Sequence, residues 1–341
     1  MDPLRFLDAP LPKSDPPERE QWRGATPEQR ARWKEVFIPH PKAVEAIRTV
    51  YEHVKQCRIE RSGSGIVVVG ETGAGKTHLV KFLIQQFAPW DRETTDRTLR
   101  PLINIKVPLR CTPIEFGRHI LARLGDPLAR RTRTEDLDTR VRGLMKDCEV
   151  RLVIIDNFHD IPERKGVRGV HKVCTWLREL IDDTPVLFLS LGDSNARDVF
   201  DNSPQLKRRA SHRCELQYFN PEGKEGAIEF ARVIKNISAY LPVAEEVSLL
   251  DKDTIMKLYM SSAGIFAYLA KFLNAACFHA VGEGRESLNE ADLGAAFAKV
   301  HGNAYSHCNP FLVNMKPRLL SEAGEPFHEL ACNNGKRDEA A

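Results

Sequence analysis

Closely spaced cysteines, long apolar runs and excess charge are all scarce in this 341-residue sequence. The eight cysteines form no Cys-x-x-Cys pair and no cluster with histidine at zinc spacing, so a reduced, cytoplasmic compartment fits best. The longest apolar stretch, residues 260–281, contains Lys271, Asn274 and His279, which favours a packed helical segment over a membrane span. A net charge of +3 is too small to indicate nucleic-acid binding, so any DNA site must come from local clustering of basic residues.

The most informative stretch that is present lies directly behind the apolar run at residues 66–69 and reads Gly70-Glu71-Thr72-Gly73-Ala74-Gly75-Lys76-Thr77. It matches G-x-x-x-x-G-K-[ST], the phosphate-binding P-loop. Glycines let backbone N–H groups curl around phosphate oxygens, and the next helix adds its positive dipole end. Lys76 is placed to reach the β and γ phosphates of ATP, and Thr77 to bind Mg²⁺. The neighbouring His78 completes the set of candidate nucleotide-binding residues.

The rest of the chain divides by pattern. Strands predicted at 66–69, 103–107, 151–156, 185–190 and 213–218 alternate with helices such as 112–125 and 170–182, which is typical of a doubly wound parallel α/β sheet. Beyond residue 221 the pattern becomes helical. We therefore expect a flexible proline-rich tail over 1–25, a helical segment over 26–60, a P-loop α/β core over 61–220, a helical lid over 221–300 and a C-terminal tail over 301–341.

A second candidate functional residue is Asp156, which follows four apolar residues of a predicted strand. The carboxyl ends of parallel strands meet at one crevice, so Asp156 is expected beside the P-loop, holding Mg²⁺ mostly through water. The next residue is Asn157, whose amide orients water but accepts no proton as a carboxylate does. Either hydrolysis is slow or another group, such as Asp160 or Asp193, helps.

Two further segments bear on hydrolysis. Ser190, with Asp193 and Ser194 as alternatives, ends a predicted strand where a polar side chain senses the γ-phosphate, although a capped turn explains these residues equally well. The basic run 207–213 is placed for an arginine finger that reaches a neighbouring subunit's ATP. We rank Arg209 first and Arg208 second, with Arg213 as a further candidate. The alternative is a solvated basic turn.

Candidate DNA contacts lie on two predicted loops. Arg110 and Thr112 open the helix after the second core strand, and Arg164, Lys165 and Arg168 surround a glycine behind Asp156. Basic loops and helix N-termini contact phosphates, and the absence of interleaved aromatics favours backbone contact without base readout. A plain solvated loop is the competing interpretation of both.

The motifs together resemble the TniB family, AAA+ ATPases of heteromeric transposons that are related to TnsC. The resemblance covers roughly residues 25–311. Besides the P-loop it rests on the runs Trp33-Lys34-Glu35-Val36-Phe37-Ile38-Pro39-His40-Pro41, Ile154-Ile155-Asp156-Asn157-Phe158-His159, the lid turn 261–269 and Asn309-Pro310-Phe311. From the first run, Ile38 and His40 join the candidate nucleotide-binding residues. The family normally carries Glu where this chain has Asn157, and the lid turn lacks an arginine for sensor 2.

The resemblance implies an AAA+ fold and an ATP- and Mg²⁺-dependent regulator of DNA transposition. Such proteins oligomerise on double-stranded DNA as rings or helical filaments, and they engage a DDE transposase and a TniQ-type targeting protein. No membrane partner is expected. Two other functions share the same core: an AAA+ helicase loader or initiator-like adaptor, and a nucleotide-gated signalling scaffold that binds no DNA.

Overall fold

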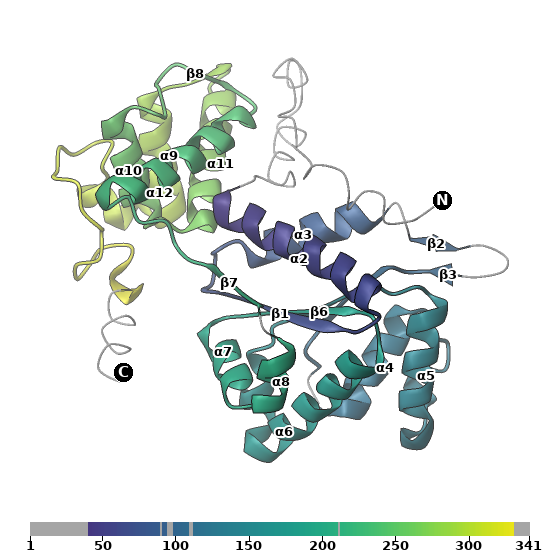
Figure 1. Cartoon of the computed structure of the whole chain (residues 1–341). Coiled ribbons are helices and arrows are strands. Elements are labelled where there is room, and N and C mark those ends of the chain that lie inside the picture. Colours follow the sequence, from purple (N-terminus) through teal and green to yellow (C-terminus); the bar gives the residue numbers. More distant parts are fainter. Residues whose placement is uncertain (1–39, 89–90, 94–97, 109–111, 211, 331–341) are drawn as a thin grey trace. The chain divides into compact units, whose positions relative to one another are not determined.

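The computed structural model describes residues 40–88, 91–93, 98–108, 112–210 and 212–330 (Figure 1). For residues 92–93, 162–169 and 205 it describes the backbone alone. The described chain forms two compact units: an α/β unit over 42–217, and a helical unit made of 218–330 together with residues 40–41.

A five-stranded parallel sheet organises the α/β unit, in the order β4-β5-β6-β1-β7. In this sheet Val69 lies opposite Gly192, and Ile155 lies opposite Ser190, so the carboxyl ends of the three central strands come together at one edge. The prediction of a doubly wound parallel sheet is confirmed. The strands are β1 (Ser64–Gly70), β4 (Leu102–Lys106), β5 (Leu152–Asp156), β6 (Leu187–Gly192) and β7 (His212–Leu216).

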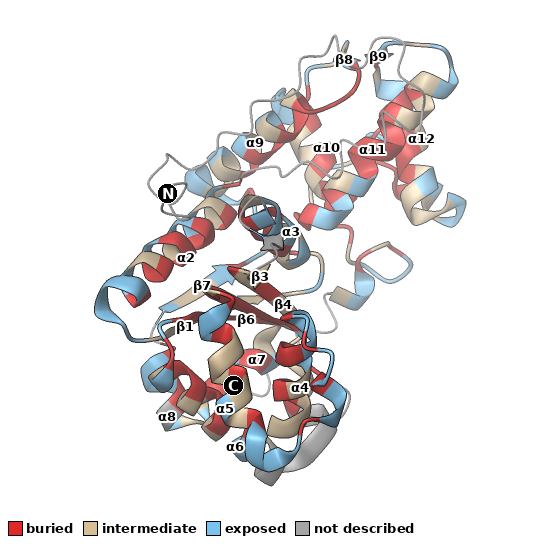
Figure 2. Cartoon of the chain, turned by 90° about the vertical axis from the view of Figure 1, so that its right-hand side faces the viewer, coloured by how far each residue is buried: buried red, intermediate tan, exposed pale blue. Residues whose placement is uncertain are grey.

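Helices cover both faces of the sheet, with α2 and α3 on one side and α4 to α8 on the other (Figure 1). The central strands and the inward faces of the helices are buried (Figure 2). The described elements are α2 (Pro41–Glu60), α3 (Lys76–Phe87), α4 (Pro113–Arg123), the 3₁₀ turn η5 (Ala129–Arg131), α5 (Thr134–Asp147), α6 (Asp160–Asp183), α7 (Ser194–Asp201), α8 (Pro204–Arg209) and a small antiparallel pair, β2 (Arg92–Glu93) with β3 (Thr98–Leu99).

Helix α6 corrects one prediction. The sequence predicts a glycine-containing loop over 164–168 and a helix from Val170, but the helix begins at Asp160. Pro162 falls in its first turn, where a missing N–H breaks no helical hydrogen bond. Gly166 inside the helix costs only about 1 kcal/mol relative to alanine. The residues of this helix from 173 to 181 bury a broad apolar face, and that packing favours one continuous helix over a loop.

The helical unit packs around the rings of Phe230, Phe272 and Phe297. Helix α12 starts with a capping box in which Asn289 and Asp292 bond each other's backbone N–H. Within the described ranges no single helix is long and apolar enough to cross a membrane, while the pair α10 and α11, bent by 113°, passes on length and composition together. The elements are α9 (Gly223–Ala239), β8 (Ala244–Glu245), α10 (Lys252–Ser262), α11 (Phe266–Gly282), β9 (Ser287–Leu288), α12 (Glu290–His301) and the 3₁₀ turn η6 (Asn303–Cys308).

The C-terminal tail predicted from residue 301 is corrected for residues 303–330. This stretch contains η6 and irregular backbone, and its Leu320 and Phe327 are buried in the helical unit. Glu325, also buried, accepts two hydrogen bonds from Arg318 at 2.8 and 2.5 Å. Apolar residues spaced this irregularly carry no helix or strand period, so the sequence pattern does not reveal that they pack.

Candidate nucleotide site

The P-loop connects β1 to α3 at the carboxyl edge of the sheet. Gly73 and Gly75 have φ angles of +85° and +104°, in the left-handed region that favours glycine. The N–H of Ala74 donates to the Glu71 carbonyl at 3.1 Å, which closes the loop. Gly75 ends the loop as the N-cap of α3, so the first N–H groups of that helix face the loop without helical acceptors. This is the geometry of a phosphate cradle.

The loop begins at Gly70, which lies close to the neighbouring strand β7. A Cβ atom at Gly70 would lie 2.7 Å from the carbonyl oxygen of Leu216. No side chain fits at that distance, so the first glycine of the motif is required by strand packing as well as by phosphate access.

Lys76 is the first residue of α3, and its side chain reaches back into this loop. Its ammonium donates to the carbonyl oxygen of Gly70 and, at 3.1 Å, to that of Glu71. Burial lowers the pKa of Lys76, and the carboxylates of Asp193, Glu71 and Asp156 oppose that shift. The lysine, the acid at the end of β5 and the acid behind β6 therefore share one electrostatic environment. A phosphate group entering the loop would replace the carbonyls as the partner of the ammonium.

Asp156 ends β5 as the sequence predicts. Its Oδ1 accepts the N–H of Asn157 at 3.0 Å, which orients the carboxylate. Asn157 itself has φ +61°, a left-handed conformation in which asparagine is enriched several-fold over most residues. The chain then turns back, and the N–H of Phe158 donates to the Leu191 carbonyl at 2.8 Å. That bond joins the end of β5 to the end of β6.

The oxygen donors available for a divalent cation are the Thr77 hydroxyl, in the first turn of α3, and the Asp156 carboxylate. Both are hard oxygen ligands of the kind Mg²⁺ takes, and Mg²⁺ keeps several waters when few protein groups bind it. Within the described part of the chain, no group of three or more His, Cys, Asp or Glu side chains is arranged to hold a metal. The donor set therefore fits a hydrated Mg²⁺ shared with a nucleotide and does not fit an all-protein metal cage.

Ser190 and Asp193 occupy different places at β6. Ser190 is buried within the strand, opposite Val67 and Ile155. Asp193 follows the strand end and caps α7 by accepting the N–H of Asn195 at 3.0 Å. Of the two, Asp193 is the residue that acts electrostatically on Lys76.

His159 fills the space between the ends of β5 and β6. Its Nε2 lies 3.4 Å from an Asp160 carboxylate oxygen, and its Nδ1 lies 3.9 Å from Asp193. The ring packs against Gly192, where an added Cβ would come within 3.2 Å of the ring nitrogen. The acids that the sequence offers as helpers for Asn157 are thus brought together around one imidazole.

The basic segment over 207–213 is mostly engaged in ion pairs within the chain. Arg209 lies 2.5 Å from Asp182, and Arg213 binds Asp201 through two nitrogens at 3.2 and 2.7 Å. Arg208, at the end of α8, is exposed, and no ion pair is found for it among the described residues.

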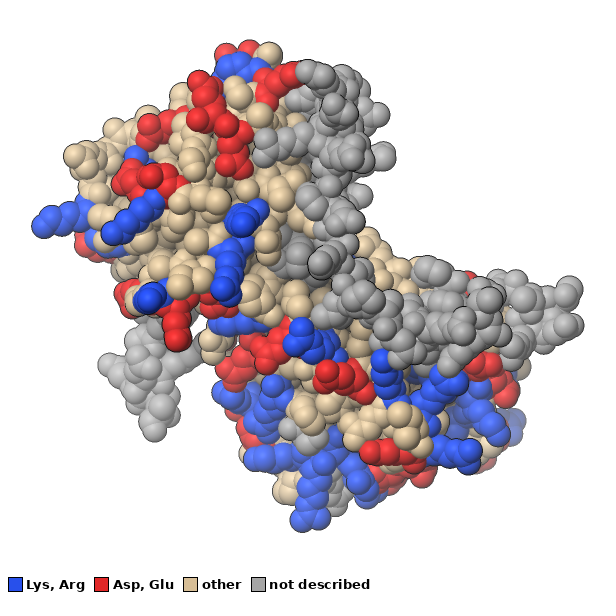
Figure 3. Space-filling view, turned by 45° about the horizontal axis from the view of Figure 1, so that its top comes forward, with Lys and Arg blue, Asp and Glu red and all other residues tan. Residues whose placement is uncertain are grey.

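The residues proposed for DNA contact are only partly described. The Thr112 hydroxyl caps α4 by accepting the N–H of Glu115 at 3.2 Å, while Arg110 lies outside the described residues. Arg164, Lys165 and Arg168 lie on helix α6, for which the backbone alone is described there. On the face shown in Figure 3, lysine and arginine side chains gather over the lower part of the α/β unit, with acidic residues among them.

Two candidate nucleotide contacts precede α2. Ile38 lies outside the described residues. His40 is buried in the helical unit, where its ring centroid lies 5.4 Å from those of Phe219 and Phe266. These ring contacts hold residue 40, just before α2, in the core of the helical unit.

Comparison with known proteins identifies the family to which this chain belongs. Residues 30–218, more than half of the chain, match the family described as bacterial TniB protein. The chain belongs to the TniB family. The match spans the P-loop and Asp156, so this TniB-family chain is an AAA+ ATPase of a family associated with transposition. No curated protein matches it.

Solved structures similar to the TniB-family chain share its fold. The ORC1 protein of Aeropyrum pernix in complex with DNA has a TM-score of 0.54 at 14% identity over 80% of this chain and 69% of that one. The ORC2 protein of the same organism, in ADPNP–ADP complexes, has a TM-score of 0.52 at 17% identity. The match covers 73% of this chain and 67% of that one. Cdc6p of Pyrobaculum aerophilum has a TM-score of 0.50 at 12% identity, over 88% of this chain and 71% of that one. At these identities the similarity shows an AAA+ fold and nothing finer.

Proposed function

We propose that this protein is an ATP-dependent regulator of DNA transposition that oligomerises on target duplex DNA and recruits a DDE transposase and a TniQ-type targeting protein. The observation that carries the proposal is the P-loop lysine, Lys76, in the electrostatic environment of Asp156 and Asp193 within a TniB-family chain. The similar ORC2 and ORC1 structures, solved with ADPNP–ADP and with DNA respectively, support nucleotide and DNA as ligands.

In the proposed ATP state Lys76 leaves the carbonyls of its own loop for the β and γ phosphates. Thr77 and Asp156 would hold a hydrated Mg²⁺, which would neutralise phosphate charge. Hydrolysis is slow because Asn157 offers no carboxylate to the attacking water. A chain that binds ATP well and hydrolyses it slowly keeps its assembled state for a long time.

The subunits assemble head to tail, and the finger that completes a neighbour's ATP site is Arg208. This choice reverses our sequence-based ranking, because Arg209 is held by Asp182 and Arg208 has no such partner among the described residues. A guanidinium reaching the γ-phosphate makes ATP part of the interface, and the contact disappears when the phosphate leaves.

Mixing two defective variants tests the finger. Lys76→Ala protein keeps its finger and loses its ATP site, while Arg208→Ala protein keeps its ATP site. In a head-to-tail assembly the mixture forms some intact interfaces and recovers hydrolysis that neither protein shows alone. Arg197→Ala, at an exposed arginine on α7, is the matched control and should hydrolyse as the wild type does. A mixture without recovered hydrolysis removes Arg208 from this role.

DNA is held through its phosphates by Arg110, Thr112 and the basic residues 164, 165 and 168. Because phosphate contacts release counterions, each lost contact lowers the log–log salt slope of binding by about one. We expect this change for charge reversal at Arg164 and Lys165. Lys146, exposed at the end of α5, is the control site. An unchanged slope for the double reversal would exclude α6 from the interface.

One experiment tests the proposal as a whole. Electron microscopy of the protein with duplex DNA and a non-hydrolysable ATP analogue should show rings or filaments around the duplex, and Lys76→Ala protein should show none. Capture of a transposase rather than a replicative helicase separates this function from that of a helicase loader. ATP-dependent DNA binding separates both from a signalling scaffold.

A further inference from the structure

One ring nitrogen at the nucleotide edge of the sheet lacks a hydrogen-bond partner. The Nδ1 atom of His159, just beyond the end of β5, is buried, and no hydrogen bond to it is found among the described residues. A buried polar atom without a partner costs free energy. Such atoms are few in native proteins, and they often belong to groups with a functional role.

The turn that joins β5 to β6 fixes this ring in place. The Phe158 N–H donates to the Leu191 carbonyl at 2.8 Å, directly before the histidine. Gly192 lies against the ring, because a Cβ atom there would come within 3.2 Å of Nδ1 and within 2.4 Å of the Ala196 Cβ. The glycine therefore lets the imidazole of His159 lie on the end of β6.

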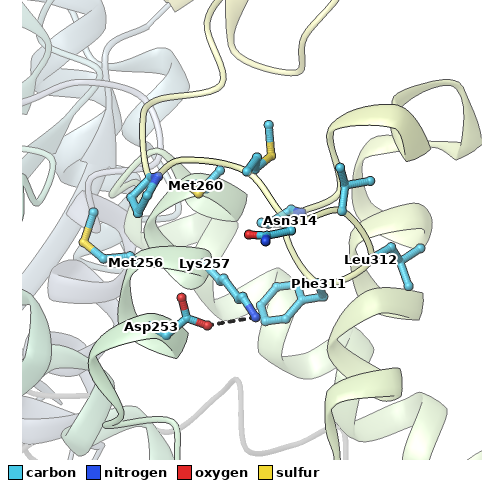
Figure 4. Close-up of a pocket in the computed structure, with 11 residues that line it drawn as sticks. Asp253, Met256, Lys257, Met260, Phe311, Leu312 and Asn314 are labelled. Atoms are coloured by element: carbon cyan, nitrogen blue, oxygen red, sulfur yellow. Dashed lines mark ion pairs between the residues drawn. The ribbon is translucent and has the colours of Figure 1, made fainter.

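The group that Nδ1 faces is the carboxylate of Asp193, whose Oδ1 lies 3.9 Å away. In a formed ion pair, such as that of Asp253 with Lys257 in the helical unit, nitrogen and oxygen lie 2.9 Å apart (Figure 4). Asp193 Oδ1 instead accepts the N–H of Asn195 and caps α7. Its side chain is 28% exposed, so it has room to turn. A shift of about 1 Å would bring it within hydrogen-bond distance of Nδ1.

Charge also connects this carboxylate to the P-loop. Burial lowers the pKa of Lys76, and Asp193 opposes that shift more than the other two acids nearby. In the proposed ATP state the ammonium turns to phosphate oxygens, which are negative themselves. Asp193 then shares its counter-charge with groups of its own sign, which is costly in a partly buried site.

We propose that His159 is a positioning residue that binds the Asp193 carboxylate when phosphates occupy the P-loop. Its Nδ1–H then donates to the carboxylate, which no longer depends on Lys76 for compensation. One bond satisfies both the unpartnered nitrogen and the uncompensated acid, and nucleotide binds more tightly as a result. The inference rests on the proposed function and assigns a further residue to the same site.

Two amide replacements of His159 separate its nitrogens, because the asparagine amide reaches the place of Nδ1 and the glutamine amide that of Nε2. His159→Asn should bind a non-hydrolysable ATP analogue within about twofold of the wild type in calorimetry, and His159→Gln about tenfold more weakly. His119→Gln, at an exposed histidine on α4, is the matched control and should bind as the wild type does. Equal affinities for the two His159 variants would overturn the proposal.

Removing the charge of Asp193 should make the glutamine substitution harmless. Asparagine caps helices about as well as aspartate does, so Asp193→Asn keeps the start of α7 but carries no charge that needs compensation. In this background His159→Gln should change the affinity less than about twofold. A further tenfold loss would show that the ring acts through its packing alone, and the proposed role would be wrong.

NMR of protein labelled with nitrogen-15 histidine tests the contact in the wild type. Adding the ATP analogue should move the Nδ1–H proton of His159 downfield, because a carboxylate acceptor deshields it. His279 is the internal reference, since its Nδ1 already lies 2.7 Å from Asp292, and its signal should not move. If the wild type binds the analogue and the His159 signal stays in place, this inference is refuted and the proposed function stands. If the wild type does not bind the analogue, the proposed function is refuted.

Discussion

Replacing Asn157 by glutamate should accelerate ATP hydrolysis and destabilise the α/β unit at the same time. The residue follows Asp156, where AAA+ ATPases of this family carry the glutamate that polarises the attacking water. Its backbone has φ +61°, which asparagine tolerates better than glutamate. The two effects have separate causes, so they can be measured and controlled separately.

The magnitudes follow from these causes. A positioned general base contributes about 10²–10⁴ to a rate, so we expect turnover to rise about 100-fold or more. A left-handed residue with a full side chain costs about 1–2 kcal/mol, and asparagine already bears part of that cost, so the free energy of unfolding should fall by about 1 kcal/mol. The DNA-bound state should become shorter-lived in proportion to turnover.

Steady-state phosphate release and urea unfolding measure the two effects. Asn157→Gly is the matched control, because glycine relieves the left-handed backbone and supplies no base. It should raise stability and leave turnover unchanged. Wild-type turnover of about 1 to 10³ per second would already refute the reasoning, since that is the ordinary range of enzymes. Equal acceleration by the glycine variant would show that backbone strain, not the missing base, limits the rate.

Three other perturbations follow from named contacts. Lys76→Ala should lower ATP affinity in calorimetry at least tenfold with an unchanged melting temperature, and an unchanged affinity would contradict the P-loop assignment. Burial raises the pKa of Asp292, but hydrogen bonds from Arg285, the Asn289 N–H and His279 outweigh this and hold it at about 2. Because this folded-state pKa is depressed from 3.8, the ionised carboxylate should contribute about 2.5 kcal/mol of stability above pH 4, and this contribution should be lost as the pH falls towards 2. Acid unfolding of Asp292→Asn protein should lack this pH dependence. Glu325→Gln should cost about 1–3 kcal/mol and speed proteolytic release of residues 303–330.

The sheet and the P-loop were predictable because each depends on short, local patterns. A β-branched run before a glycine-rich loop and an amphipathic segment fixes strand, turn and helix within 20 residues, and the structure has all three. Helix α6 was not predictable at its start, because Gly166 and Gly169 lower local helix propensity while the packing that overrides it comes from residues further along. The packed stretch 303–330 was missed for a related reason. Its order comes from Asn309 and from the Arg318–Glu325 pair, which are contacts between positions without a period.

The site was predictable in its phosphate-binding half and less so in its acidic half. Lys76 and Asp156 are specified by motif spacing, whereas the proximity of Asp193 to Lys76 depends on two crossover connections that no sequence window contains. The choice between Arg208 and Arg209 likewise depends on the fold and not on a local motif. Both are exposed basic residues on one short helix, and they differ only in that Asp182 of a distant helix end meets one of them. Sequence identifies which residue types are present, and the fold decides which of them are already engaged.

The same reasoning connects Asn157 to the proposed switch. A glutamate at a left-handed position would strain the backbone that links Asp156 to β6 through the Phe158 N–H. Asparagine offers no base and suits the left-handed turn, so the proposed slow hydrolysis and the connection between β5 and β6 depend on the same residue. His159 then packs between Asp160 and Asp193 against Gly192, where an added Cβ would lie 2.4 Å from the Cβ of Ala196. The proposed switch then depends on two separate groups: an ATP site that has no carboxylate at position 157, and the proposed finger Arg208 of a neighbour, which stabilises phosphate charge and accepts no proton.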